Sequence, residues 1–172
     1  MEAIENILSR RSIRRYTDVR ICDEDLHKIL EAGMSGPSCV NARDWSFIVV
    51  RERETLEKMA DANGRPALPL KDAALGILVL GDLDRAFKGA PDYWIIDGAI
   101  AAQNMILAAN ALGIASVWLG TYPQMNRVDR LRELFSLPDH AVPHSIIAFG
   151  YADEDVPVKG FYEEDRVHFE KW

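Results

Sequence analysis

Positive charge is concentrated in one short segment near the N-terminus. Five arginines lie between residues 10 and 20, accompanied by a single acidic residue, Asp18. Arg10 and Arg14 are four residues apart with the Ser12 hydroxyl between them, and guanidinium groups match phosphate oxygens bidentately. The pattern predicts a clamp for a terminal phosphate. Taken alone, the segment leaves open a solvent-exposed basic turn or a docking site for an acidic partner.

A second polar segment joins an expected helix to an expected strand. It reads Gly36-Pro-Ser-Cys-Val-Asn-Ala-Arg-Asp-Trp-Ser-Phe47, and its Gly, Pro, Ser and Asn are typical of tight turns. Ser38, Asn41 and Arg43 are polar side chains that can converge on the heteroatoms of a planar ring. An ordinary helix-to-strand turn would have the same composition.

A third segment, Gly113-Ile-Ala-Ser-Val-Trp-Leu-Gly-Thr-Tyr-Pro123, ends an expected strand in a glycine-containing turn. A glycine such as Gly120 allows backbone amides to approach a ligand closely. The alternative is structural, with Gly113 ending a helix and Gly120 forming a turn.

Other chemistries have weaker signals. His140 and His144 have i, i+4 spacing but lie between Pro138 and Pro143, where a continuous helix is disfavoured, so no metal site is predicted. The sequence contains no nucleophile elbow, P-loop or dinucleotide-binding glycine motif. Two cysteines are too few for a disulfide framework, so reduced thiols are expected. No catalytic acid, base or nucleophile is assigned.

Composition narrows the function further. The chain has 172 residues, and 20 Lys and Arg against 27 Asp and Glu give a net charge of −7. This balance argues against nucleic-acid binding, which needs a basic surface. The apolar stretch 93–114 contains Asp97, Gln103 and Asn104, which predicts a buried helix rather than a membrane span. The amphipathic N-terminus does not resemble a secretory signal, so a cytoplasmic protein is expected.

The periodicity of apolar residues predicts the elements that must position these segments. Helices are expected over residues 2–10, 24–35 with Asp23 as N-cap, 53–62, 93–113 and 126–135, and strands over 45–50, 74–80, 114–119 and 144–151. The run 74–80 is apolar on both faces, as in a central strand. The polar stretch from residue 152 ends in aromatic residues, which predicts a tail that docks on a surface. Propensity alone leaves α/β and α+β open.

Together these segments resemble the nitroreductase family of FMN-dependent oxidoreductases, over nearly the whole chain. The family's phosphate clamp is similar to Arg10-Arg-Ser-Ile-Arg-Arg-Tyr16, and its Pro-Ser-x-x-Asn-x-Gln-Pro-Trp-x-Phe motif is similar to residues 37–47. The family's central helix is similar to the segment with Asp97 and Gln103-Asn104. Its late glycine-rich turn is similar to Leu112-Gly113 through Gly120, and its C-terminal end is similar to Val167-His168 to Trp172.

The resemblance implies an α+β, three-layer fold with a mostly antiparallel sheet flanked by helices. It also implies a homodimer of single-domain chains, residues 1–172, whose tails, about 152–172, wrap the partner. Arg10, Arg11, Ser12 and Arg14 would hold the FMN phosphate and ribityl chain, assisted by Lys159. Ser38 and Asn41 from the other subunit, within a loop that starts at Pro37, would meet the flavin ring with Arg43. Leu119 and Gly120 would line its far side.

The activity that the resemblance implies is a ping-pong transfer of hydride from NAD(P)H, a transient donor, through flavin N5 to a small nitroaromatic or quinone. Dehalogenation or dehydrogenation on the same scaffold is the alternative chemistry. Two departures stand out, because Arg43 and Asp44 replace the family's usual Gln-Pro. Gly160-Phe161 also follow Lys159 where the family tends to have an arginine, for which Arg166 is a candidate substitute.

Overall fold

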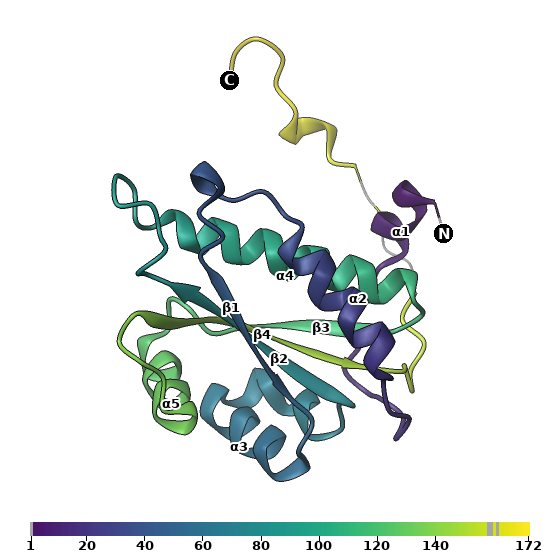
Figure 1. The fold of residues 1–172 in the computed structure, drawn as a ribbon. Helices are drawn as coiled ribbons and strands as arrows, with labels where there is room; N and C mark the ends of the chain where they lie inside the picture. The colour runs from purple at the N-terminus through teal and green to yellow at the C-terminus, as the bar shows by residue number, and fades with distance from the viewer. Residues whose placement is uncertain (1, 158–159, 161) are drawn as a thin grey trace.

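A four-stranded antiparallel sheet forms the middle layer of the chain (Figure 1). The computed structural model describes residues 2–157, 160 and 162–172. The strands are β1 (Trp45–Val50), β2 (Leu75–Asp82), β3 (Ala115–Gly120) and β4 (Ala141–Gly150), in the order β1-β2-β4-β3. Residues 75–81 of β2 are all buried, which confirms a central strand covered on both faces. β1 and β3 are the two edges.

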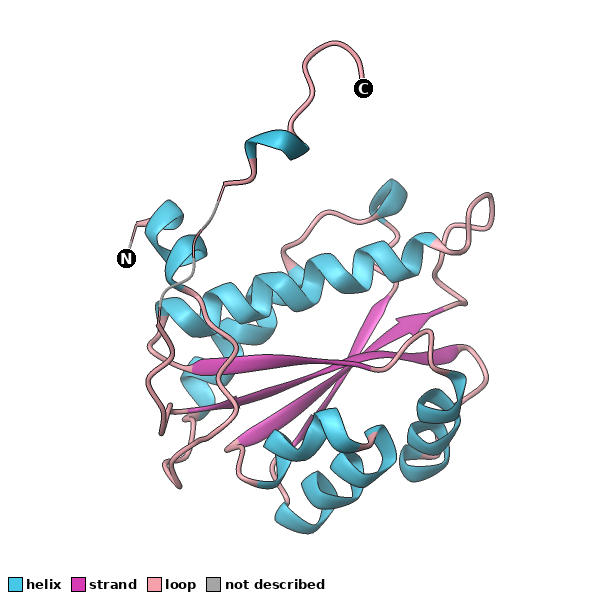
Figure 2. Ribbon diagram, turned by 180° about the vertical axis from the view of Figure 1, so that it is seen from behind, coloured by secondary structure: helices cyan, strands magenta, loops and turns pink. Residues whose placement is uncertain are grey.

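Helices cover both faces of this sheet (Figures 1 and 2). The α-helices are α1 (Ala3–Ser9), α2 (Asp23–Met34), α3 (Arg53–Asn63), α4 (Tyr93–Ala111) and α5 (Met125–Phe135). The short 3-10 helices are η1 (Cys39–Asn41), η2 (Arg65–Lys71) and η3 (Glu164–Arg166). α2 and α4 lie on one face, and α3, η2 and α5 lie on the other. The expected α+β, three-layer fold is therefore confirmed.

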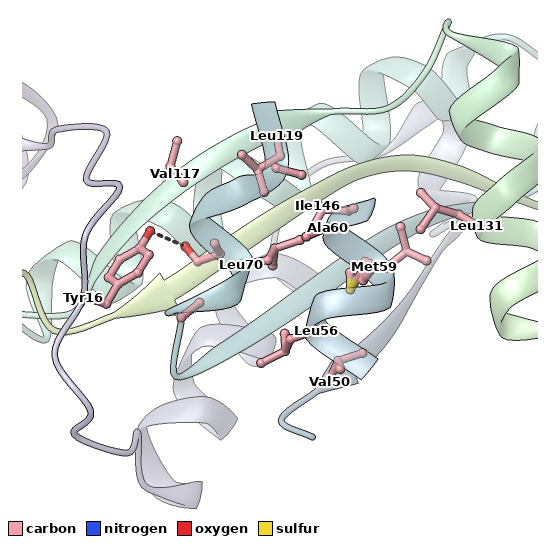
Figure 3. Close-up of a cluster of buried hydrophobic side chains, with 14 of the residues drawn as sticks. Tyr16, Val50, Leu56, Met59, Ala60, Leu70, Val117, Leu119, Leu131 and Ile146 are labelled. Atoms are coloured by element: carbon pink, nitrogen blue, oxygen red, sulfur yellow. Dashed lines mark hydrogen bonds between the residues drawn. The ribbon is translucent and has the colours of Figure 1, made fainter. Parts of the chain in front are cut away.

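Each face of the sheet has its own apolar cluster. One cluster lies between the sheet and α3, η2 and α5 (Figure 3). It includes four fully buried side chains: Leu56, Leu70, Leu131 and Ile146. On the other face, a second cluster includes Ile29 of α2 and Met105 of α4. Burial on both faces fixes which edge of the sheet each connecting loop reaches.

Most element boundaries lie within two residues of the expected ones, and three differences stand out. The α2 N-cap is Cys22 rather than Asp23, and the Cys22 sulfur accepts from the Asp25 amide at 3.5 Å. η2 forms over Arg65–Lys71, where Gly64 and Pro66 indicated only a break. β4 begins at Ala141, three residues early, because strand pairing with β2 continues past a register shift near Val79 and includes Pro143.

The C-terminal residues extend away from the three layers, and the C-terminus lies apart from the N-terminus (Figure 1). All of residues 162–172 are exposed. In the part of the chain that the structure describes, no helix combines the length and apolar character needed to cross a bilayer.

Candidate functional site

The arginine segment is fixed to the β3 edge of the sheet and to the chain that follows β4. The Ile13 amide donates to the Ser116 carbonyl of β3 at 3.0 Å. The Tyr16 hydroxyl is buried and donates to the Ile13 carbonyl at 2.6 Å. Gly150 is required beside Tyr16, because a Cβ there would lie 2.7 Å from the ring. The backbone that carries the arginines is therefore immobilised at the start of β3.

The arginines of this segment have different surroundings. Arg11 donates to the carbonyl oxygens of Leu8 at 2.8 Å and Pro157 at 3.1 Å, while its Nη2 is buried without an acceptor. Arg15 forms an ion pair with Glu154 at 3.7 Å. Arg10 and Arg14 form no ion pair with any described residue. A buried nitrogen without an acceptor and two arginines without an ion pair are suited to an anionic ligand.

Glu154 completes the local charge arrangement without neutralising the Arg14 guanidinium. Its carboxylate accepts from the backbone amides of Arg14 at 2.5 Å and Arg15 at 3.2 Å. These bonds lower the pKa of Glu154. Among the described residues, the Arg14 guanidinium donates only to the Ser12 carbonyl, at 3.3 Å, so Ser12 lies beside it.

A pocket of about 490 Å³ lies between Arg14 and η2. Its lining combines two cations, one acid and an apolar wall: Arg14, Arg65, Pro66, Leu68, Pro69 and Asp72. Hydrophobic and aromatic walls with a few convergent polar groups are the usual composition of small-molecule sites. Arg65 and the other η2 residues were not among the predicted site residues, because residues 63–66 were interpreted only as a chain break.

Gly120 lies at the other end of β3 from the arginine segment. Ser116 and Gly120 are about 13 Å apart at ~3.3 Å per residue. A Cβ at Gly120 would have no atom within 4 Å, so space is open beside this backbone. The Leu119 side chain is buried in the core, and therefore only its backbone can face a ligand (Figure 3).

The loop with Pro37, Ser38, Asn41 and Arg43 is tightly organised. The Ser38 hydroxyl accepts from the Arg43 amide at 3.0 Å, and Arg43 Nε donates to Asn41 Oδ1 at 3.0 Å. Val40, Asn41 and Arg43 have φ angles of 45°, 59° and 51°, a region that non-glycine residues seldom occupy. Such strain persists only where surrounding contacts enforce it.

One of those contacts comes from α4, where Asp97 Oδ2 accepts from the Cys39 amide at 2.9 Å. Asp97 is 2% exposed, and Asp44 beside it is 1% exposed with both carboxylate oxygens lacking a hydrogen-bond donor. Burial raises the pKa of Asp44 to about 6, and the charges of Asp97 and Asp82 add to the effect. A carboxyl pair therefore lies under the loop.

A single chain does not bring this loop to the arginine segment. The loop leads into β1, whereas the arginines lie along β3 at the opposite edge of the sheet. Along α4, the loop contacts Asp97 while Asn6 beside the arginines donates to Leu107, ten residues or about 15 Å further on. Within one chain, the loop and the arginine segment therefore lie at opposite edges of the sheet.

Two residues of the tail, Lys159 and Arg166, were also predicted to belong to the site. Lys159 lies outside the described residues. Arg166 forms an ion pair with Glu163 at 3.3 Å on the extended tail, away from the arginine segment of its own chain (Figure 1).

Comparisons with known proteins are consistent over the whole chain. The family model described as "Nitroreductase family" matches residues 7–151. A Methanothermobacter thermautotrophicus protein, with the provisional name NADH dehydrogenase/NAD(P)H nitroreductase, is 44% identical over 100% of this chain and 88% of its own. The FMN reductase [NAD(P)H] of Bacillus subtilis is 29% identical over 99% of this chain and 74% of its own. The solved FMN-dependent nitroreductase from Clostridium difficile superposes with a TM-score of 0.91 at 32% identity, covering 98% and 99% of the two chains.

Proposed function

Because this chain belongs to the nitroreductase family of NAD(P)H oxidoreductases, we propose that it binds FMN and reduces small planar acceptors, nitroaromatics or quinones, at the expense of NAD(P)H. The observation that carries the proposal is the arrangement of groups along β3. Uncompensated arginines lie at one end of the strand, and open space beside Gly120 lies at the other.

The chemistry of these residues fits FMN. Arg10, Arg14 and the unsatisfied Nη2 of Arg11 suit a dianionic phosphate. The pocket between Arg14 and η2 offers an apolar wall for a flat ring. In the proposed complex, the Ser12 hydroxyl and the Gly120 backbone complete the contacts at the two ends of β3.

When bound, FMN would supply the redox chemistry for a ping-pong cycle between NAD(P)H and the second substrate. The chain's own residues bind and orient the cofactor and exclude water. Asn63 and Arg127 hold the Gly120 carbonyl at 3.3 and 2.7 Å, so the backbone beside the ring is fixed. No side chain of the protein has to act as an obligate acid or base.

We further propose a homodimer of single-domain chains in which the loop of Ser38, Asn41 and Arg43 reaches the FMN site of the partner. The separation of the loop from the arginine segment within one chain supports this arrangement. The exposed face of α4 adds support for a dimer, because it carries two large apolar side chains: Ile96 is 52% exposed and Tyr93 is 44% exposed. Exposed apolar side chains that lie close together are typical of surfaces that bind another protein chain.

The test is the spectrum of the purified protein, followed by anaerobic titration with NADH and NADPH. We expect flavin absorbance, bleaching by at least one nucleotide, and its return when a quinone or nitroaromatic is added. A protein that neither carries nor takes up FMN would refute the proposal and favour docking of an acidic partner. Flavin that no nicotinamide reduces would favour another flavin chemistry on this scaffold.

Replacement of Arg14 tests the site within the same assay. Arg14→Ala should lower FMN affinity by at least tenfold, since charge-assisted hydrogen bonds contribute about 1.5–3 kcal/mol. Arg20→Ala is the matched control, because Arg20 is exposed and lies outside the pocket. Equal FMN affinity in the two variants would remove Arg14 from the site.

A further inference from the structure

The pocket beside Arg14 has a second cationic wall, formed by Arg65 at the start of η2. The two arginines are 51 positions apart in sequence and belong to elements that meet only through the fold. Arg65 is exposed, and its guanidinium makes no hydrogen bond or ion pair with a described residue.

Two other arginines, one beside η2 and one beside Gly120, donate to backbone carbonyls. At the opposite end of η2, Arg53 donates to the carbonyls of Leu70 and Ala73. Arg127 donates to the Gly120 carbonyl at 2.7 Å. These residues serve the fold, whereas the Arg65 guanidinium remains available to whatever occupies the pocket.

The backbone that carries Arg65 is fixed close to Gly120. Asn63 is fully buried, and its side-chain amide donates to the Gly120 carbonyl at 3.3 Å and accepts from the Thr121 hydroxyl at 2.8 Å. Gly64, with φ of 81°, then turns the chain into η2, where Pro66 occupies the first turn. Arg65 therefore lies at the Gly120 end of β3, two residues from this anchor.

The arginine segment lies at the other end of the strand, where Ser12 pairs with Ser116. An FMN whose phosphate is bound by Arg10 and Arg14 would extend along β3 and place its ring at the Gly120 end. Asp72, the single acid of the pocket lining, follows the last residue of η2 and so lies toward the phosphate end. The charge of Arg65 is thus uncompensated where the ring would lie.

We propose that Arg65 is a further flavin-binding residue, which lies beside the ring end of the cofactor and stabilises the reduced flavin. The inference rests on the proposed function, since it requires FMN in this pocket. Reduction to the anionic hydroquinone adds negative charge to the ring, and a nearby cation favours that form. An exposed cation at this position also contributes to the binding of the oxidised cofactor, but to a smaller extent.

The experiment measures the midpoint potential of the FMN-loaded protein with a reference dye, and the affinity for oxidised FMN by fluorescence. Arg65→Gln should weaken the binding of reduced FMN about tenfold more than that of oxidised FMN, which lowers a two-electron potential by about 30 mV. Arg65→Lys retains the charge and should stay near the wild-type potential. Arg130→Gln removes an exposed arginine of α5 outside this pocket and should leave the potential unchanged.

The outcomes separate this inference from the proposed function. A flavin-loaded Arg65→Gln protein with the wild-type potential would overturn the role of Arg65 while leaving the FMN proposal intact. An equal shift in Arg130→Gln would also overturn it, because the effect would then reflect net charge alone. A wild-type protein without FMN affinity would overturn both. If Arg65→Gln fails to fold, Arg65→Lys alone tests the proposal. Because lysine keeps the positive charge, a potential lowered by about 30 mV in Arg65→Lys would contradict the charge argument.

Discussion

The carboxyl group of Asp44 is buried, so its ionisation lowers the stability of the folded protein by an amount that depends on pH. The side chain is 1% exposed, and burial together with Asp97 and Asp82 raises its pKa from 3.8 to about 6. The folded state therefore holds the proton more tightly than the unfolded state. The free energy of unfolding should decrease as pH rises from about 4 to about 6, and remain lower above that range.

Asp44→Asn should remove this penalty, because an amide is neutral at every pH and can still donate to Asp97. At pH 8 the variant should be more stable than the wild type by up to about 3 kcal/mol, from about two pKa units at 1.36 kcal/mol each. Near pH 4 the difference should vanish. Urea unfolding at both pH values measures it, and Asp129→Asn on the exposed face of α5 controls for loss of a carboxylate. A variant less stable than wild type at pH 8 would contradict this account.

The residue types of the site were predictable, but their individual roles were not. Arg10, Arg11 and Arg14 are identical side chains in one short motif, so the sequence predicts the same role for all three. Arg11 bonds to Pro157, 146 positions away, and only the fold brings that carbonyl within reach. Arg65 was missed for the same reason, since its relation to Gly120 depends on the buried side chain of Asn63.

At the scale of elements, two strand glycines face opposite environments. Gly81 of β2 packs against α4, where a Cβ would lie 2.2 Å from Trp94 Cε3. Trp94 is itself confined, with its ring 4.9 Å from that of Tyr122 in an edge-to-face contact. Gly120 of β3 borders open space. The first glycine is needed for packing, and the second leaves room for a ligand.

Alanine at these two positions should therefore have opposite effects. Gly81→Ala should lower the free energy of unfolding by about 1–3 kcal/mol, because the indole must shift in a packed layer. Gly120→Ala should change stability by less than about 0.5 kcal/mol yet weaken FMN binding. Thermal unfolding and FMN titration of both variants measure the two effects. Unchanged FMN affinity in Gly120→Ala would remove the space beside Gly120 from the flavin site.

The elements with the strongest apolar patterns were the ones that the sequence predicted well. β2 is buried over residues 75–81, and α4 ends at Ala111, two residues before Gly113, whose φ of 76° gives the left-handed turn after the helix. η2 was missed because a 3-10 helix with Pro66 and Pro69 has no helical periodicity to detect. The strand order β1-β2-β4-β3 depends on non-local pairing, which periodicity does not encode.

For the whole molecule, the distribution of apolar surface matters more than any single contact. Trp172 and Phe169 on the tail are 102% and 84% exposed, an arrangement that is costly in water. At the β1 edge, a pocket of about 500 Å³ has apolar residues of α2 and β1, including Met34, Trp45 and Phe47, in its lining together with Arg43 and Arg85. An exposed aromatic tail can dock on the apolar part of such a pocket at an edge strand when two copies meet.

Replacement of Phe169 and Trp172 by serine should accordingly convert the proposed dimer into a monomer, because the tail would lose the apolar side chains that dock on the partner. FMN retention should fall in parallel, since the loop of Ser38 and Asn41 would no longer reach the FMN site of the partner. Sedimentation equilibrium measures the association, and flavin absorbance per chain measures retention. Val19→Ser, at another exposed apolar position on the body of the chain, should leave both unchanged. If the doubly substituted protein still dimerises with wild-type affinity, the tail does not hold the partner. If the wild-type protein is a monomer that retains FMN, one chain completes the site alone.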